Sequence, residues 1–168
     1  MTRAAVFILV GIFSGGAAHA QQSLPTRDVD VIYGAAQNVT QRWRFRAVDQ
    51  KLRLDPPTAG LHMIIDYPAH TMAVVNDTDR TVMTVPAPPI ASGRGTPRGT
   101  DTLLGQACTV WEQTDSQNQP TQTCYTGDGV MLRARRGTQT LVEAVAIAYA
   151  PADPAAYTIP SGYTRLAK

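Results

Sequence analysis

The side chains that could do chemistry are few in this 168-residue chain, and they lie far apart. His62 and His70 flank a turn at Pro68, which places His62 near Asn76 and His70 at the hairpin tip. Two imidazoles so placed would not share a metal ion, and we expect each to be a surface or strand-face histidine. No serine lies in a Gly-x-Ser-x-Gly sequence. The sequence therefore predicts no catalytic residue, no metal site and no cofactor.

The two cysteines predict a structural disulfide. Cys108 and Cys124 are centred on Ser116, within a turn-rich stretch, so they would lie opposite each other across a hairpin. The alternative is two unpaired buried thiols. A bond closing a loop of this size stabilises a fold by about 3 kcal/mol. The spacing is not that of a Cys-x-x-Cys redox enzyme.

The last hairpin predicts an unusual carboxylate. A two-residue turn near Gly137 sets Val145 opposite Val130, and it places Glu143 opposite Leu132 on the apolar face. A carboxylate there needs a hydrogen-bond donor or an opening to water, which a binding cavity would provide. The alternative is a register one residue different, with Glu143 outside. The candidate ligand-binding residues are Trp43, Val130, Leu132, Glu143 and Val145.

A cationic stripe is the second candidate site. Arg42, Arg44 and Arg46 share one face of a predicted strand, and Arg53 follows on the next strand. Arginines so arranged could hold an anionic headgroup or an acidic partner. We favour a solvated outer face, because acidic residues are available as local partners: Asp28, Asp30, Asp49 and Asp55.

The first twenty residues have the layout of a cleavable secretory signal. Arg3 precedes an apolar run, Ala4 to Phe13, and small residues end at Ala20. We expect cleavage after Ala20, a single soluble periplasmic domain over 21–168, and no transmembrane segment in it. No cysteine stands at the new N-terminus for lipid attachment. The formal net charge of +2 is too small for a nucleic-acid binder.

Composition and periodicity predict strands. Glu and Lys together number four, whereas β-branched and aromatic residues are abundant. Apolar residues alternate from 28 to 85 as a meander of short antiparallel strands, and hairpins follow after 108. The segment 86–102 is rich in proline and glycine and is expected to be a long loop.

Three short motifs carry a family resemblance. The stretches 104–112 and 124–133, with Pro160-Ser161-Gly162-Tyr163 near the end, resemble exported bacterial domains related to the LolA/LolB/LppX-like superfamily. The resemblance spans residues 27–163. It implies an all-β, mainly antiparallel fold, a strongly curved meander sheet or incomplete β-barrel with little helix. Its concave apolar face would receive acyl chains or be plugged by helices or loops. This chain departs from the family because it shows no clear amphipathic helix.

The sequence leads to two hypotheses about function. The first is a periplasmic, non-enzymatic binding protein that holds a lipid or a lipoprotein acyl chain between the sheet and the 86–102 loop. The second is an envelope structural or protein-interaction module with a filled core. An open apolar pocket of about 300 Å³ or more would favour the first.

Overall fold

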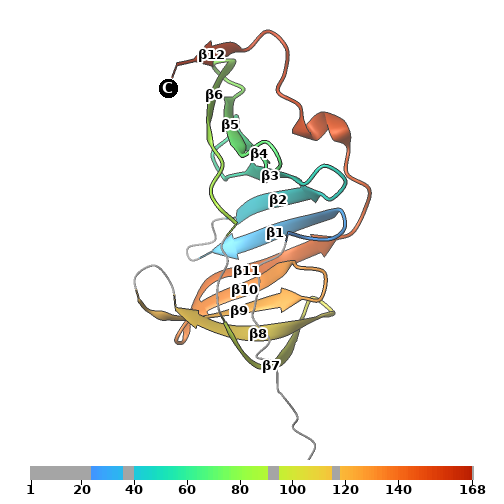
Figure 1. The fold of residues 1–168 in the computed structure, drawn as a ribbon, viewed down its shortest axis with the longest axis vertical. Coiled ribbons are helices and arrows are strands. Elements are labelled where there is room, and N and C mark those ends of the chain that lie inside the picture. Colours follow the sequence, from blue (N-terminus) through green and yellow to red (C-terminus); the bar gives the residue numbers. More distant parts are fainter. Residues whose placement is uncertain (1–23, 36–39, 91–94, 115–117, 168) are drawn as a thin grey trace, which may run out of the picture.

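One open sheet dominates the computed structural model, which describes residues 24–35, 40–90, 95–114 and 118–167 (Figure 1). The expected signal segment lies outside the described residues. The sheet consists of β1 (Val29–Ala35), β2 (Thr40–Arg46), β3 (Lys51–Asp55), β4 (Leu61–Asp66), β5 (Thr71–Asn76), β6 (Thr81–Pro86), β7 (Thr96–Leu103), β8 (Gln106–Thr114), β9 (Pro120–Thr126), β10 (Met131–Arg136), β11 (Gln139–Ala148) and β12 (Thr164–Leu166). The all-β, mainly antiparallel fold class is therefore confirmed.

Two meanders build the sheet, and they join where the first strand meets the last long one. Strands β1 to β6 are neighbours in chain order, and so are β7 to β11. β1 then pairs antiparallel with β11, and Val31 lies opposite Ile147. β12 adds a parallel edge strand to β6. The sheet ends at β12 and β7 and does not close into a barrel.

The connection from β6 to β7 requires the sheet to curve. These strands lie ten positions apart in the sheet order, which in a flat sheet would be about 48 Å. The nine residues 87–95 between them reach at most about 35 Å when fully extended. The two ends of the sheet must therefore bend toward each other, and the described residues Pro89 and Ile90 lie over the concave face.

The two faces of the sheet are packed differently. One buried cluster includes Val31, Phe45 and Leu132, and it lies across both meanders. The second cluster lies on the other face of β4 to β6, under the C-terminal segment 152–163. That segment contains the short 3₁₀ helix η2 (Pro154–Tyr157), whose Tyr157 is buried against the sheet. No helix in the described part of the chain is long and apolar enough to cross a membrane.

The long loop expected at 86–102 is shorter than predicted. Residues 96–103 form β7, which pairs with β8 at the sheet edge. The sequence predicted a loop here because Pro97 and Gly99 both disfavour a central strand. An edge strand has a hydrogen-bonded neighbour on one side only and so tolerates proline, and the register shifts between Pro97 and Gly99.

The predicted disulfide is confirmed, although the register differs by one step. Cys108 and Cys124 are bonded, with their Cα atoms 5.4 Å apart. Cys108 lies opposite Thr126, and Cys124 lies opposite Val110. The cysteines are therefore diagonal neighbours on adjacent strands and not a directly opposed pair, because the hairpin is centred one residue beyond Ser116.

Candidate functional site

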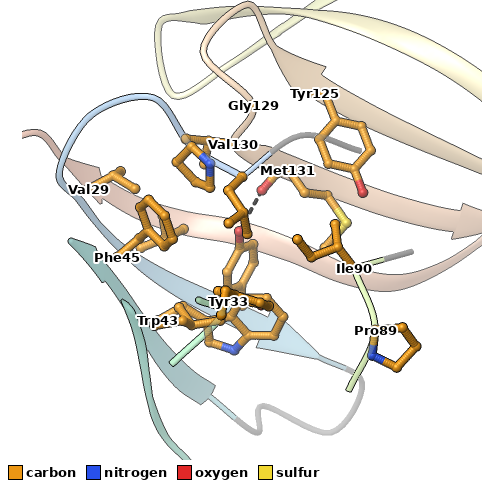
Figure 2. Close-up of a pocket in the computed structure, with 15 residues that line it drawn as sticks. Val29, Tyr33, Trp43, Phe45, Pro89, Ile90, Tyr125, Gly129, Val130 and Met131 are labelled. Carbon is orange, nitrogen blue, oxygen red and sulfur yellow. Dashed lines mark hydrogen bonds between the residues drawn. The ribbon is translucent and has the colours of Figure 1, made fainter. Parts of the chain in front are cut away.

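An open pocket of about 320 Å³ lies against the concave face of the sheet (Figure 2). It sits where the two meanders join, near the ends of β2 and β9 and the beginnings of β1, β3 and β10. Residues 24–25, before β1, and residues 89–90, after β6, form its other sides. The residues that line it are Leu24, Pro25, Val29, Val31, Tyr33, Trp43, Phe45, Leu52, Tyr67, Pro89, Ile90, Tyr125, Gly129, Val130 and Met131.

Two packed aromatic rings form the centre of the pocket wall. Tyr33 and Trp43 come from neighbouring strands and meet edge to face, with ring centroids 5.2 Å apart. The Tyr33 hydroxyl donates a hydrogen bond to the carbonyl oxygen of Met131 at 2.6 Å (Figure 2). This bond ties β1 to the beginning of β10 across β11. The wall is therefore held in place before any ligand arrives.

The N-terminal segment forms a firmly anchored side of the pocket. Next to the lining residues Leu24 and Pro25, Thr26 N donates to the carbonyl of Asp128 at 3.0 Å. Arg27 pairs with the Asp128 carboxylate at 2.6 Å and stacks 3.5 Å above the ring of Tyr149.

The Asp28 carboxylate adds two further anchors to this segment. It accepts the backbone N–H groups of Ala47 and Ala152, both at 2.8 Å. Asp28 therefore holds the N-terminal segment, the β2–β3 turn and the C-terminal segment together.

The segment after β6 forms the opposite side with less anchoring. Ala87 N donates to the carbonyl of His70 at 3.0 Å. Pro88 and Pro89 have no N–H to donate, and Ile90 is exposed while it lines the pocket. This side of the pocket is therefore held mainly by apolar contact.

The described lining carries no carboxylate, ammonium, guanidinium, imidazole or thiol. Its side-chain polar groups are the indole of Trp43 and the hydroxyls of Tyr33, Tyr67 and Tyr125. Burial raises the pKa of Tyr33 and of Tyr67 above the ordinary tyrosine value. Both hydroxyls therefore stay protonated at neutral pH, and the pocket presents an uncharged surface.

The expected ligand-binding residues fall into two groups. Trp43 and Val130 line the pocket, and their role in ligand binding stays a prediction. Leu132 is fully buried in the core next to it, and Val145 is exposed beside Gly34. The register that places Glu143 on the apolar face is wrong, and the alternative, with Glu143 outside, holds. This residue lies opposite Arg133 and not opposite Leu132.

A bulge explains the different position of Glu143. The register shifts between Ala134 and Arg135, so that Leu141 has no partner and every later residue of β11 moves by one position. Glu143 therefore lies beside the Arg133 guanidinium, at 3.7 Å, and its side chain remains 43% exposed. It does not line the pocket.

The arginine stripe is paired with local carboxylates. Arg42 Nε donates to Asp30 at 2.9 Å, and Arg46 pairs with Asp49 at 2.8 Å. Arg44 and Arg53 both bind Asp55, at 2.6 and 2.9 Å. Burial raises the Asp55 pKa, but the two guanidinium groups outweigh it and hold the pKa below the ordinary value. The expected local ion pairs are present, but Arg44, Arg46 and Arg53 are only 20–24% exposed, so the stripe is less solvated than the favoured interpretation held.

The two histidines do not come together. His70 is exposed at the tip of the β4–β5 turn, whereas His62 is buried with its Nδ1 atom 3.0 Å from Asp77 Oδ2. Tyr163 donates to the other oxygen of Asp77 at 2.9 Å. Within the described ranges, no three histidine, cysteine or acidic side chains gather as metal ligands would.

The sequence did not reveal most of the pocket. Val31, Tyr33 and Phe45 belong to the predicted alternating strands, and this alternation was the available signal. Leu24 and Pro25 precede the first strand, and Pro89 and Ile90 lie in the linker. The pairing of β1 with β11 brings these parts together, and no local pattern encodes that pairing.

Comparisons with known proteins show the fold. No protein-family model and no curated protein matches the chain. It is similar to an uncharacterised conserved protein from Thermus thermophilus, with a TM-score of 0.64 and 9% identity over 84% of this chain and 90% of that one. It is also similar to PNGF-II in a C2 crystal form, with a TM-score of 0.58 and 12% identity over 83% of this chain and 30% of that one. The resemblance to LolA-type carriers stays a prediction, and the chain shares its curved-sheet fold with these two structures.

Proposed function

We propose that this chain is an exported, non-enzymatic binding protein of the bacterial periplasm that holds the apolar part of a ligand in its pocket. The ligand class is an acyl chain of a lipid or a lipoprotein. The observation that carries the proposal is an open pocket of about 320 Å³ whose described lining has no charged side chain. That volume lies at the lower end of the range for small-molecule sites, about 300 to 1,000 Å³.

The lining favours a tail inside and a headgroup outside. An ionised headgroup placed in the pocket would lose water and find no opposite charge, which is costly. Aliphatic and aromatic walls such as Val31, Phe45 and Leu52 suit a hydrocarbon chain. The same lining favours binding over catalysis, because general acid–base chemistry needs groups that titrate near neutral pH.

The chain seals its other packed face with its own C-terminal segment, whereas the pocket face stays open. Export would suit the confirmed disulfide, since disulfides persist in oxidising compartments.

The test is native mass spectrometry of protein purified from a periplasm, followed by organic extraction and lipid analysis. The proposal expects a stoichiometric acyl-chain species. A clean apo mass, together with no binding of the apolar probe N-phenyl-1-naphthylamine, would overturn it and favour the envelope interaction module.

A pocket-filling variant makes the test site-specific. Met131→Trp puts a large ring into the pocket, and Met83→Trp is the matched control because Met83 on β6 does not line it. We expect the first to weaken probe binding about tenfold, which corresponds to about 1.4 kcal/mol. The second should leave binding unchanged.

A further inference from the structure

The end of the sheet that holds the pocket carries apolar residues on its turns. At this end, called the pocket end, β1 begins and β2 ends, and Val29 lies opposite Phe45. The β2–β3 turn there presents Val48, which is 79% exposed. The strand pairings from β1 through β11, β10 and β9 to β8 place the β7–β8 turn at the same end (Figure 1). That turn presents Leu104, which is 46% exposed.

Two of the described turns at the opposite end of the sheet are polar. The β5–β6 turn there consists of residues 77–80, with the sequence Asp-Thr-Asp-Arg, and the β10–β11 turn consists of Gly137 and Thr138. In the described part of the chain, no turn at that end carries an exposed large apolar side chain. Scattered exposed apolar residues are normal on proteins, but here the large ones on the described hairpin turns, Val48 and Leu104, share one end.

Leu104 also occupies a position that disfavours leucine. Its φ is 52° and that of Gly105 is 73°, the left-handed pair of a two-residue hairpin turn. Such turns prefer Asn-Gly, because the leucine β-carbon crowds the backbone there. The other described non-glycine residues with positive φ are polar: Gln50, His70, Arg80 and Asn118. The half-exposed Leu104 side chain gains little from packing, so the turn alone does not account for a leucine.

We propose that the pocket end docks reversibly on a lipid bilayer, with Val48 and Leu104 inserted at the boundary between headgroups and acyl chains. The two side chains sit on separate turns with a span of sheet between them. A protein partner would need a continuous complementary area of about 800 Å², whereas a fluid bilayer accommodates isolated apolar points.

The immediate surroundings of both residues suit this partner. Beside Val48, Asp49 pairs with Arg46 at 2.8 Å, and Lys51 lies between Asp49 and Asp66, at 3.7 and 3.4 Å, so that two cations face two carboxylates. The residues flanking Leu104 are uncharged from Thr102 to Cys108. Two partly inserted side chains give weak, reversible attachment. The inference rests on the proposed function for its purpose, which is to bring the pocket to the bilayer that supplies or receives the acyl chain.

The experiment is cosedimentation with vesicles of phosphatidylethanolamine and phosphatidylglycerol. Val48→Asp and Leu104→Asp should each weaken vesicle binding about tenfold. The chain offers matched controls in Val145 and Leu166, which are 53% and 49% exposed and lie away from the pocket-end turns. Val145→Asp and Leu166→Asp should bind vesicles as the unmodified protein does. Equal losses in both pairs, or no vesicle binding by the unmodified protein, would overturn the proposal and turn attention to a protein partner.

A second variant separates docking from folding and from the pocket. Leu104→Asn suits the left-handed turn, so it should raise the midpoint of thermal unfolding while it weakens vesicle binding. Binding of N-phenyl-1-naphthylamine in vesicle-free buffer should stay unchanged, because Leu104 does not line the pocket. A more stable variant with undiminished vesicle binding contradicts docking. If the unmodified protein does not bind the probe, the proposed ligand-binding function of the pocket is contradicted. Docking is then judged separately, by the vesicle experiment.

Discussion

The two packed faces of this sheet are completed in different ways. On the outer face of β4 to β6, the C-terminal segment 152–163 covers Ile64, Val75 and Val82, and Tyr157 fills the centre. On the concave face, the segments at 24–25 and 89–90 cross the sheet and leave a pocket of about 320 Å³ between them. The same chain thus seals one face and leaves the other open.

The difference lies in how each cover is attached. The C-terminal segment is fixed by Tyr157 in the core, by Arg53 Nη1 donating to the Ala156 carbonyl at 3.0 Å, and by Tyr163 on Asp77. Among the described residues, the cover at 87–90 has one backbone hydrogen bond, from Ala87 to His70. A sealed face contributes burial and therefore stability, whereas an open face retains space that a ligand can fill.

Truncation of Tyr157, at the centre of the sealed face, should have the largest effect on stability. Tyr157→Ala removes a buried ring from the sealed face, and we expect the free energy of unfolding to fall by about 4 kcal/mol. Tyr67→Ala at the pocket should cost only about 1 kcal/mol, because part of its ring borders space that is already empty. Urea denaturation of both variants measures the difference. Equal costs would mean that the two faces are packed alike.

Loss of the disulfide should have the next largest effect. Cys108 and Cys124 close a loop of sequence separation 16, so the double change to serine should lower the free energy of unfolding by about 3 kcal/mol. The bond joins β8 to β9, away from the C-terminal segment. The cost of Tyr157→Ala should therefore be the same with and without it, and a large coupling would show that the two regions do not unfold independently.

Acid should loosen the sealed face through His62. Burial, with Arg53 nearby, lowers the pKa of His62 below its ordinary 6.5, although Asp77 and Asp55 act in the opposite direction. The unfolded chain therefore takes up a proton before the folded chain does. The stability that His62 contributes is complete above pH 6.5 and is lost as the pH falls through the folded pKa.

Urea midpoints at about pH 7.5 and 5.0 measure this dependence. This range reports mainly on His62, because carboxylates with lowered pKa values change stability at more acidic pH. His62→Gln should flatten the difference between the two midpoints, and the exposed His70→Gln should keep it. The same slope in both variants would assign the pH dependence to other groups.

The strands could be predicted from the sequence because their signal is local. Alternation placed β2 to β6 and the later hairpins near their observed positions, and the expected export and the even number of cysteines supported the disulfide. Two misplaced features have local explanations as well. An edge position tolerates Pro97, and one bulge at Ala134 and Arg135 moves Glu143 away from the apolar face.

The pocket could not be predicted in the same way. It depends on the pairing of β1 with β11, two strands from opposite ends of the described chain, and on the curvature that brings Pro89 and Ile90 over the sheet. Val31 and Tyr33 carry the alternation of any half-buried strand. Only the long-range pairing decides that they face a pocket and not a filled core.

A matched pair of isoleucines gives the smallest and sharpest comparison. Ile90 covers the pocket, and Ile159 packs from the C-terminal segment against the sealed face. Ile159→Ala should lower the free energy of unfolding by about 1.5 kcal/mol, and Ile90→Ala by about 0.5 kcal/mol or less. Saturating N-phenyl-1-naphthylamine should reverse the order of the two variants for a different quantity, the stabilisation that the bound probe adds. Ile90→Ala should then lose more of the ligand-induced stabilisation, because its side chain contacts the space that the probe fills and that of Ile159 does not. If the probe stabilises both variants equally, it does not occupy the pocket beneath Ile90.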